Sequence, residues 1–578
     1  MTEPATGRPQ VFQIGLTDTG TRWLRSVFRR SGYTVSAPES STVAGDVCFA
    51  ARTGGRPLAG MEDVDLFTDL EHTSSFFEPP LLGQQEFAVL HQHFPDAYFL
   101  LNVGDVDAWL HRRSNARDGA YLRAAAHAFD VDVTEVPALW RTRWLRHEEA
   151  VRRHFAGHDR FAVLDVETQG LAELTRFVAP DYALASTGVP PAPKRSAPAP
   201  SPAPSPPSPP TGGHRSPAFV AEVVEFATRT SPEVPSGMPW RRTSRLYAHW
   251  DGAERVVDNR DRPLACAVDL TDPRWPFLLV SENTKHRRTE GVLNELWQSG
   301  GRRGAHVDMQ DARRYGTPET GAPDEPVLTF CRRVGAANLV LWPLPGYHTP
   351  GSSDFPGPAC RDTVPFDDKD DVLAWRGNLT GRALPELGPA GSERQHATTL
   401  AEELGTGRDD EVVAALRTVP RYRVLDRLVD RPDTDVGLAL GEKWKAKETP
   451  PQIARLVRPR LGYEELYRHR YLLSLSGNDS ASNFLMASDS GSVVLREEDG
   501  WEWFYDGQFR PWEHYLPLVR GGDDLEERLE WARTHPQECR EMSARSREAV
   551  RRLVDPGNRR EYLNGIREVY ESRIQSRS

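Results

Sequence analysis

The chain has 578 residues, more than a single hydrophobic core usually serves, so we expect two or more domains. Hydrophobic residues make up 38% and charged residues 27%, the net charge is −11, and no basic stretch is interleaved with aromatic residues. This composition is typical of a globular protein and argues against nucleic acid as the main partner. The apolar runs are too short to span a bilayer, and the first residues lack a signal pattern. We therefore expect a cytoplasmic protein without a transmembrane segment, with peripheral membrane contact left open.

The cysteines and histidines predict no bound metal. The five cysteines are odd in number and widely spaced, and none forms a C-x-x-C pair. They therefore indicate neither a disulfide framework nor a zinc site. His91 and His93 form an H-x-H pair, but no acidic or cysteine partner follows at metal-ligand spacing.

The first part of the chain alternates apolar runs with amphipathic stretches. The pattern predicts strands and helices in turn, at Val11–Leu16 (strand), Thr21–Arg30 (helix), Tyr98–Val103 (strand), Asp105–Arg113 (helix) and Phe161–Val166 (strand). Strands that alternate with helices predict a parallel, doubly wound α/β sheet.

Residues 187–217 are dominated by proline, alanine and serine. Such a composition favours extended polyproline II and cannot bury a core. We therefore predict a first domain at 9–186, a linker at 187–217 and a second domain at 218–578. A proline-rich ligand for a partner protein is the alternative to a plain linker.

The α/β alternation resumes after the linker. Four further strands are predicted, at Pro276–Val280, Asn338–Trp342, Tyr471–Leu475 and Ser492–Leu495. The last stretch, Leu525–Ile574, is charged and has a helical period.

A candidate phosphate-binding loop lies between the first predicted strand and helix. In this arrangement backbone N–H groups and the helix dipole can hold a phosphate. The spacing is that of a P-loop, but Thr21 stands where a Walker A lysine would, and Arg22 replaces the next Ser or Thr. The candidate residues are Thr19, Gly20, Thr21 and Arg22.

This loop and three later segments, 64–69, 94–110 and 159–166, together resemble the PAPS-dependent sulfotransferase family. The resemblance covers most of residues 9–186 and implies a P-loop-like sulfotransferase fold. The family's catalytic lysine corresponds to Asp18, and its 3′-phosphate-binding arginine corresponds to Gly104. A carboxylate repels a phosphosulfate, and the chain has no lysine before Lys194. We expect a degenerate, inactive module to which PAPS binds weakly or not at all.

The second domain carries two glycine-containing turns at predicted strand ends. Arg376 closes one strand immediately before Gly377, and carboxyl ends of strands face the ligand crevice in open α/β sheets. A second strand runs into a Gly/Ser-rich turn suited to phosphate, and aromatic and acidic residues follow. The candidate donor-binding residues are Arg376, Gly377, Thr380, Gly381, Gly477, Asn478, Ser480, Ser482, Glu502 and His514.

The order of these motifs, W-R-G-x-x-T-G, G-N-D-x-x-S, E-x-F-Y and P-W-x-H-Y-x-P, resembles glycosyltransferase family 90 over about residues 290–555. That family includes capsule-associated fungal proteins, bacterial lipopolysaccharide and capsule transferases, and animal protein O-glucosyl and O-xylosyl transferases. The resemblance implies a GT-B fold of two Rossmann-like halves, a UDP-sugar donor, inversion at the anomeric carbon, no obligatory metal and no bound cofactor. The family's diphosphate arginine corresponds to Asn483.

An inverting transfer needs a carboxylate that takes the proton of the acceptor hydroxyl. The family order of segments places Asp311 in this role, with Asp308 as the fallback. Asp311 as the N-cap of a following helix is the non-catalytic alternative.

The sequence therefore predicts a glycosyltransferase that moves a sugar from a UDP-sugar to a glycan or other hydroxyl acceptor, of the capsule or lipopolysaccharide type. Its partners are the nucleotide sugar and the acceptor, and its first domain is an inactive sulfotransferase-like module. Two alternatives stay open: a bifunctional glycosyl- and sulfotransferase, and a non-catalytic glycan-binding scaffold.

Overall fold

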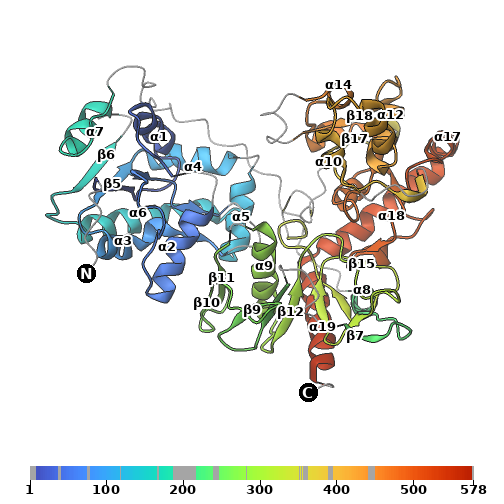
Figure 1. Ribbon diagram of the computed structural model, residues 1–578, viewed down its shortest axis with the longest axis horizontal. Coiled ribbons are helices and arrows are strands. Elements are labelled where there is room, and N and C mark those ends of the chain that lie inside the picture. The colour runs from blue at the N-terminus through green and yellow to red at the C-terminus, as the bar shows by residue number, and fades with distance from the viewer. Residues whose placement is uncertain are drawn as a thin grey trace. The chain divides into compact units, whose positions relative to one another are not determined.

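The computed structural model describes residues 8–575 except 37–40, 74–78, 117–118, 166–167, 169, 186–215, 239–246, 282, 350–351, 353–354, 356–361, 388–394 and 441–448. The described residues fall into two units (Figure 1). Unit 1 comprises residues 8–185 and 249–298, and unit 2 comprises 216–238, 247–248 and 299–575. The predicted linker lies outside the described residues apart from 216–217.

Unit 1 contains helices and strands in alternation. They are β1 (Val11–Gln13), α1 (Thr21–Arg30), α2 (Ser41–Thr53), β2 (Leu66–Phe67), β3 (Glu71–His72), β4 (Leu81–Leu82), α3 (Phe87–His93), β5 (Tyr98–Val103), α4 (Val106–Asn115), α5 (Ala120–Phe129), α6 (Val136–His154), β6 (Phe161–Asp165), α7 (Gly170–Val178), β9 (Val256–Asp258), β10 (Cys266–Val268), β11 (Phe277–Leu279) and α9 (Thr284–Gln298).

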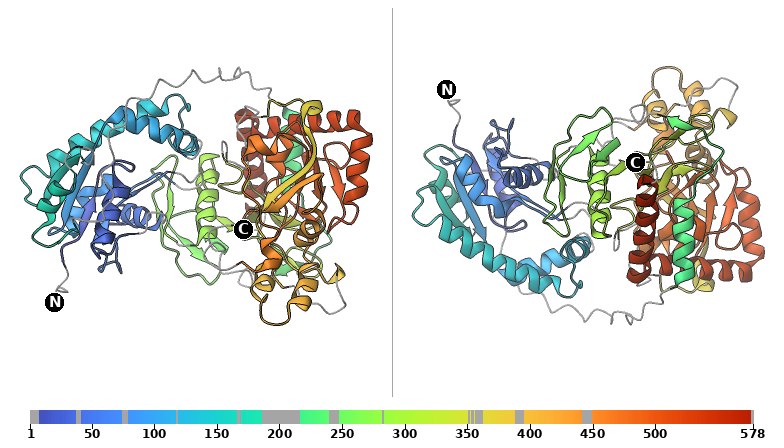
Figure 2. Two further views of the ribbon diagram at one scale, coloured as in Figure 1. Left: turned by 90° about the horizontal axis from the view of Figure 1, so that it is seen from above. Right: turned by 90° about the horizontal axis from the view of Figure 1, so that it is seen from below.

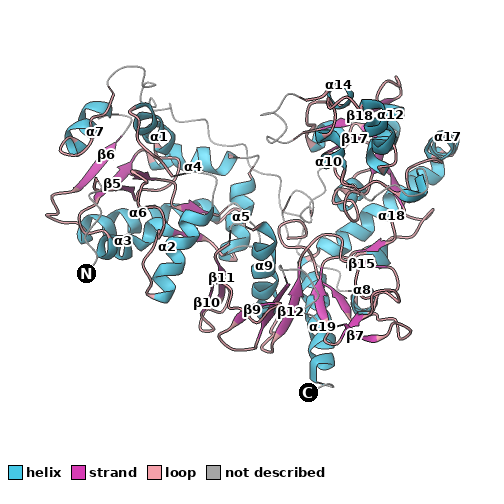
Figure 3. Ribbon diagram, viewed as in Figure 1, coloured by secondary structure: helices cyan, strands magenta, loops and turns pink. Residues whose placement is uncertain are grey.

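The central sheet of unit 1 has the strand order β2-β1-β5-β6, and every pairing is parallel. Val11 packs with residues of α1 and α7, whereas its neighbour Phe12 packs with residues of α2, α3 and α6. Both faces are thus covered, which explains why the strands are apolar at nearly every position. The predicted parallel α/β sheet is confirmed (Figure 3), and the sulfotransferase fold stays a prediction.

An antiparallel hairpin, β10–β11, completes unit 1. Ala267 and Leu278 of this hairpin share a buried cluster with Ala44 of α2 and Leu81 of β4. Arg52 of α2 also donates a hydrogen bond to the carbonyl oxygen of Trp275 (3.1 Å). Residues 249–298 therefore belong to compact unit 1, through the apolar packing of the hairpin on α2. The predicted domain bounds, 9–186 and 218–578, stay a prediction.

Unit 2 contains α8 (Pro217–Thr228), β7 (Ser236–Met238), β12 (Ala305–Asp308), β13 (Ala322–Pro323), β14 (Val327–Thr329), β15 (Arg332–Arg333), β16 (Leu339–Leu341), β17 (Asp370–Gly377), α10 (Ala397–Glu402), α11 (Asp409–Leu416), α12 (Pro420–Leu428), β18 (Thr434–Leu438), α14 (Pro451–Ala454), α15 (Tyr463–Leu466), β19 (His469–Ser474), α16 (Phe484–Ser488), β20 (Val493–Glu497), β21 (Trp501–Glu502), β22 (Leu516–Leu518), α17 (Leu525–Thr534), α18 (Pro536–Val554) and α19 (Pro556–Gln575). Strand β8 (Tyr247–Trp250) lies where the chain passes from unit 2 to unit 1.

Two groups of parallel strands organise unit 2. Strands β12, β14 and β16 are parallel neighbours, and a five-stranded parallel sheet has the order β18-β17-β19-β20-β22. The five-stranded sheet packs its buried strand residues against α10, α11, α12, α17 and α18 in one core. Parallel strands end at a common edge, where open α/β sheets bind their ligands. The GT-B arrangement of two Rossmann-like halves stays a prediction.

The C-terminal stretch is helical, as predicted. It forms α17, α18 and α19, and α19 lies beside α8 (Figure 2). Pro536 stands in the first turn of α18, where its missing N–H costs no hydrogen bond. Within the described parts of the chain, none of the helices combines the length and the apolar content that a bilayer span requires.

Candidate active site

Two turns at the carboxyl edge of the five-stranded sheet come together in unit 2. One follows β17 and contains Thr380 and Gly381, and the other follows β19 and contains Gly477. A Cβ atom on Gly477 would lie 2.7 Å from the Thr380 Oγ1 atom, and one on Gly381 would lie 3.2 Å from the Gly477 carbonyl oxygen. Gly381 also has a φ of 108°, which favours glycine. The two turns that the sequence suggests separately therefore form one site, and glycine permits their close approach.

Arg421, in the first turn of α12, ties these turns to each other. Its Nη1 atom donates to the Asn378 carbonyl oxygen (2.8 Å) and to Thr380 Oγ1, and its Nη2 atom donates to the Leu475 carbonyl oxygen (2.7 Å). The guanidinium carbon lies over the Trp375 ring, 5.1 Å from its centroid. The Nε atom is buried and has no hydrogen-bond partner among the described residues.

The charge of Arg421 persists at neutral pH. Burial lowers the pKa of its guanidinium to about 10, and Glu497 and Asp479 act in the opposite direction. A protonated guanidinium is therefore fixed between the two turns. The sequence analysis missed Arg421, because no motif surrounds it and only the folded chain brings α12 to the strand ends.

Buried carboxylates hold the turn after β19. Glu497 accepts hydrogen bonds from the backbone N–H groups of Ser476 and Gly521 (2.9 Å each), and burial raises the pKa of its carboxyl group. The Ser476 hydroxyl donates to Asp499 (2.6 Å). These bonds fix the backbone that leads into Gly477. The sequence analysis missed both acids, although Glu497 and Asp499 follow the predicted strand Ser492–Leu495 within four residues.

Asp311 lies beside this turn. It follows β12, and the next residue, Ala312, donates its backbone N–H to Asp479 Oδ2 (3.1 Å). The Cys331 thiol lies 3.7 Å from the same oxygen. The half-buried Asp311 therefore lies in the chain next to a residue that is bonded to the second turn, and its role as a base stays a prediction. Residues 309–321 are all described and form no helix, so the N-cap alternative for Asp311 is wrong.

Asp308, the fallback base, is buried and paired within the protein. Its carboxylate is fully buried, forms an ion pair with Arg313 (2.9 Å) and accepts a hydrogen bond from the Tyr315 hydroxyl (2.9 Å). Burial raises the pKa of Asp308, and Arg313 acts in the opposite direction. The structure thus separates the two candidates: Asp308 holds its neighbours, and Asp311 lies at the strand ends.

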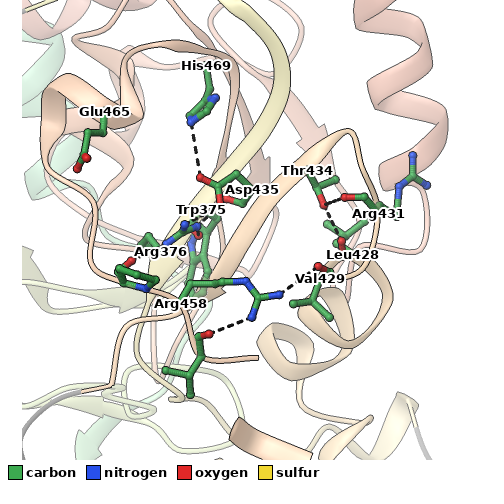
Figure 4. A network of polar contacts seen from close by, with 12 residues as sticks. Trp375, Arg376, Leu428, Val429, Arg431, Thr434, Asp435, Arg458, Glu465 and His469 are labelled. Carbon is green, nitrogen blue, oxygen red and sulfur yellow. Dashed lines mark hydrogen bonds and ion pairs between the residues drawn. The ribbon is translucent and has the colours of Figure 1, made fainter. Parts of the chain in front are cut away.

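Arg376 extends toward β18 (Figure 4). Its Nη2 atom donates to Asp435 (2.6 Å) and its Nε atom to the Pro459 carbonyl oxygen (2.9 Å). Asp435 also lies 3.7 Å from His469. Gly377 permits the close approach of the Trp375 ring, because a Cβ atom at this position would collide with that ring. Arg376 and Gly377 therefore adjoin the joined turns and support the packing of the strand end.

The remaining residues of the second turn vary in their contacts. The Ser480 hydroxyl accepts a long hydrogen bond from Arg496 (3.5 Å), and Arg496 forms a buried ion pair with Asp506 (2.7 Å). Ser482 is half-buried. The Asn478 Oδ1 atom is buried and has no hydrogen-bond partner within the described parts of the chain. Asn478 thus offers an acceptor next to Gly477.

Glu502 and His514 have partners on other elements. Glu502 is buried and accepts from Arg332 (2.9 Å), which also donates to the Phe226 carbonyl oxygen at the end of α8 (2.7 Å). His514 Nδ1 accepts from the Arg510 backbone N–H (3.1 Å), and burial lowers the pKa of the imidazole. His514 lines a cavity of about 430 Å³ between α8 and α18. No contact between described residues joins these two side chains to the turns.

The candidate phosphate loop of unit 1 precedes α1, as predicted. Gly20 is the N-cap of α1 with a φ of 92°, Thr19 and Thr21 are buried, and Arg22 is exposed. Asn102 donates to the Thr19 carbonyl oxygen (2.8 Å), so a side chain of the protein itself packs against the loop. The ligand of this loop stays a prediction.

Part of unit 2 is similar to known proteins. Residues 443–572 match the model of Glycosyl transferase family 90. Protein O-glucosyltransferase 3 of Rattus norvegicus is 24% identical over 117 residues, which are 20% of this chain and 23% of the relative. The same protein of Homo sapiens is 22% identical over 117 residues, again 20% of this chain and 23% of the relative. An uncharacterized protein of Frog virus 3, 027R, is 28% identical over 249 residues, 37% of this chain and 24% of the relative.

The chain thus spans about a quarter of the length of these relatives. The family match contains β19, β20, the turn with Gly477, α17, α18 and most of α19. It lies in the part of the chain where the sequence motifs resemble this family. The family match and the O-glucosyltransferase relatives together support a glycosyltransferase.

Proposed function

We propose that the chain transfers a sugar from a UDP-sugar to a hydroxyl group of a glycan or other acceptor, with inversion at the anomeric carbon. The observation that carries the proposal is the joining of two glycine turns by Arg421 beside Asp311, partly within the segment that matches the family. The proposal includes an acceptor of the capsule or lipopolysaccharide type and a cytoplasmic location.

The joined turns suit the diphosphate of the donor. Arg421 supplies a fixed positive charge there, and a preorganised cation stabilises the charge that develops on a departing diphosphate. Asn478 Oδ1 offers an acceptor for a hydroxyl or N–H of the nucleotide. Donor binding stays a prediction for Arg376, Gly377, Glu502 and His514. Their contacts within the protein account for these residues without a bound donor.

Asp311 is the proposed general base. Its carboxylate takes the proton of the acceptor hydroxyl while the acceptor oxygen forms a bond to the anomeric carbon. The bond from that carbon to the diphosphate oxygen breaks on the opposite face, and UDP carries away the electron pair. Attack and departure on opposite faces invert the configuration.

Unit 1 is proposed to be a sulfotransferase-like module without sulfotransferase activity. Asp18 and Gly104 stand where the resembling family has cations, and Arg25 of α1 already pairs with Asp69 (3.1 Å). Transfer of labelled sulfate from PAPS to a glycan, lost in Arg22→Ala, would favour the bifunctional alternative.

A thermal-shift screen of UDP-, GDP- and dTDP-sugars tests the proposed donor. A ligand at a hundred times its dissociation constant adds about 2.7 kcal/mol to the free energy of unfolding. We expect a UDP-sugar to stabilise the full-length chain and to be consumed with release of UDP. Stabilisation by no nucleotide sugar, together with glycan binding, would favour the scaffold alternative.

A further inference from the structure

Unit 2 carries an aromatic surface that is separate from the joined turns. The Trp512 and Trp531 ring centroids lie 5.2 Å apart at 81°, and Trp531 stacks on His535 at 4.5 Å and 7°. We call these three residues the Trp512 platform. Trp512 precedes β22, which runs parallel to β20, so the platform belongs to the amino-terminal end of the sheet. The joined turns lie at the carboxyl ends of the strands, so the platform is a separate surface.

The backbone of Trp512 is held in a conformation that bulky residues rarely adopt. Its φ is 65°, in the left-handed region that favours glycine. The turn enforces this conformation, because the Trp512 N–H donates to the Tyr515 carbonyl oxygen (2.8 Å) and the His514 N–H donates to that of Arg510 (3.0 Å). The indole remains 43% exposed, so burial does not explain a tryptophan at this position. An outlier of this kind points to a function of the side chain.

The charged groups around the indole are arginines paired with carboxylates. The Arg528 guanidinium lies over one face of the Trp512 ring, 4.9 Å from its centroid, and is paired with Asp524 (3.2 Å) and Glu527 (2.9 Å). Arg510, at the start of the turn, is paired with Glu513 (3.4 Å). Each arginine therefore has at least one carboxylate beside it, and these paired groups carry no net positive charge to attract a polyanion. It does offer both hydrogen-bond donors and acceptors to a neutral polar ligand.

We propose that the Trp512 platform binds a neutral oligosaccharide. The face of an aromatic ring is electron-rich, and the C–H groups on one face of a pyranose ring carry partial positive charge, so the two faces attract. The hydroxyl groups of the sugar would then reach the paired charges of the rim. A single exposed indole with a polar rim matches the size of one sugar ring rather than a protein interface, which buries far more surface.

Titration of the full-length chain with maltohexaose, cellohexaose and hexa-N-acetylchitohexaose tests this proposal. Tryptophan fluorescence and calorimetry report binding. We expect saturable binding of at least one hexasaccharide, weakened at least tenfold in Trp512→Ala and retained in Trp512→Phe. The matched control is Val519→Ala, which alters another side chain of unit 2 that is 50% exposed and should leave binding unchanged.

Trp512→Gly separates binding from a structural role. Glycine adopts a φ of 65° without strain, so this variant should keep the unfolding temperature within a few degrees and lose saccharide binding. A large fall in the unfolding temperature would instead make Trp512 a structural residue and overturn the proposal. Absence of saturable binding, binding unchanged in Trp512→Ala, or preference for a heparin hexasaccharide over the neutral ones would overturn it as well.

The proposal does not depend on the transfer reaction. UDP stabilisation measured in the same Trp512→Ala sample reports the donor site alone, and we expect it to match that of the unaltered chain. Loss of saccharide binding in Trp512→Ala with intact UDP binding supports the platform. Absence of UDP binding in the unaltered chain contradicts only the proposed donor.

Discussion

Arg421 joins two turns through one guanidinium, and lysine cannot reproduce that geometry. Its planar fork bonds Asn378 and Thr380 on one side and Leu475 on the other. We expect Arg421→Lys to weaken UDP affinity about tenfold, since the charge is kept and the fork is lost. Calorimetric titration with UDP measures this change. The control is Arg417→Lys, an exposed arginine paired with Asp426, which should bind UDP as the unaltered chain does. Equal affinities of the two variants would remove Arg421 from the donor site.

The two carboxylates after β12 should respond differently to neutralisation. Asp311→Asn should lower turnover by about 10²- to 10⁴-fold and leave UDP affinity nearly intact, which is the behaviour of a positioned base. Asp308→Asn should instead destabilise the fold by about 3 kcal/mol, because it leaves Arg313 buried without its counter-charge. Initial rates of UDP release and denaturant unfolding of both variants distinguish these effects. Sugar transfer by Asp311→Asn at the unaltered rate would exclude Asp311 as the base.

At the scale of the element, the close approach of the two turns depends on Gly477. In Gly477→Ala the new methyl group would lie 2.7 Å from Thr380 Oγ1 and 3.4 Å from Arg421 Nη2, so the turns must separate. We expect a loss of stability of about 1–3 kcal/mol, typical of overpacking, together with weaker UDP binding. Gly462→Ala is the matched control, because its methyl group would meet only Glu465 at an ordinary 3.7 Å. Thermal unfolding with and without UDP tests both variants.

The elements that were predicted well are those whose apolar pattern is set locally. Strand β5 coincides with its predicted bounds, because a strand buried on both faces leaves a continuous apolar run. The helix predicted from Asp105 begins one residue later, since the Asp105 carboxylate is the N-cap and accepts from the backbone N–H groups of Asp107 and Ala108 (2.9 Å each).

The candidate site was predictable only in part, for a physical reason. The rule that parallel strands end at one edge is sufficient to bring Gly381 and Gly477 together. The sequence does not reveal that Arg376 bonds to Asp435 or that Arg421 supplies the charge between the turns, because both depend on which neighbouring element each side chain meets. Glu502 looked like a ligand group for the same reason, and Arg332 occupies its carboxylate.

At the scale of the whole molecule, unit 1 should lose stability in mild acid. His91 lies 3.0 Å from His154 through their ring nitrogens, and its ring centroid is 4.8 Å from that of His158. Burial, and next the charges of His158 and His154, lower the pKa of His91. A histidine in the unfolded chain has a pKa of about 6.5, so as the pH falls below that value the unfolded state takes up protons first and stability declines until the pH passes the lower pKa of the folded state.

We therefore expect the unfolding temperature of unit 1 to fall between pH 7.5 and pH 5.5, two conditions that bracket the ordinary histidine pKa of about 6.5. His91→Phe should reduce this fall, because phenylalanine suits the aromatic neighbours Phe99 and Phe155 and does not titrate. Differential scanning calorimetry at both pH values measures the effect, with His93→Gln as the control on the same helix. An equal acid response in His91→Phe and the unaltered chain would assign it to other groups.

Unit 1 is built from two segments of the chain, 8–185 and 249–298, which are synthesised at different times. Helix α2 leaves the ribosome long before β10 and β11, whose Ala267 and Leu278 pack with its Ala44. At about 5–20 residues per second, this delay is on the order of ten seconds or more. During that interval the nascent chain carries an uncovered apolar helix face, which is exposed to aggregation until β11 has emerged.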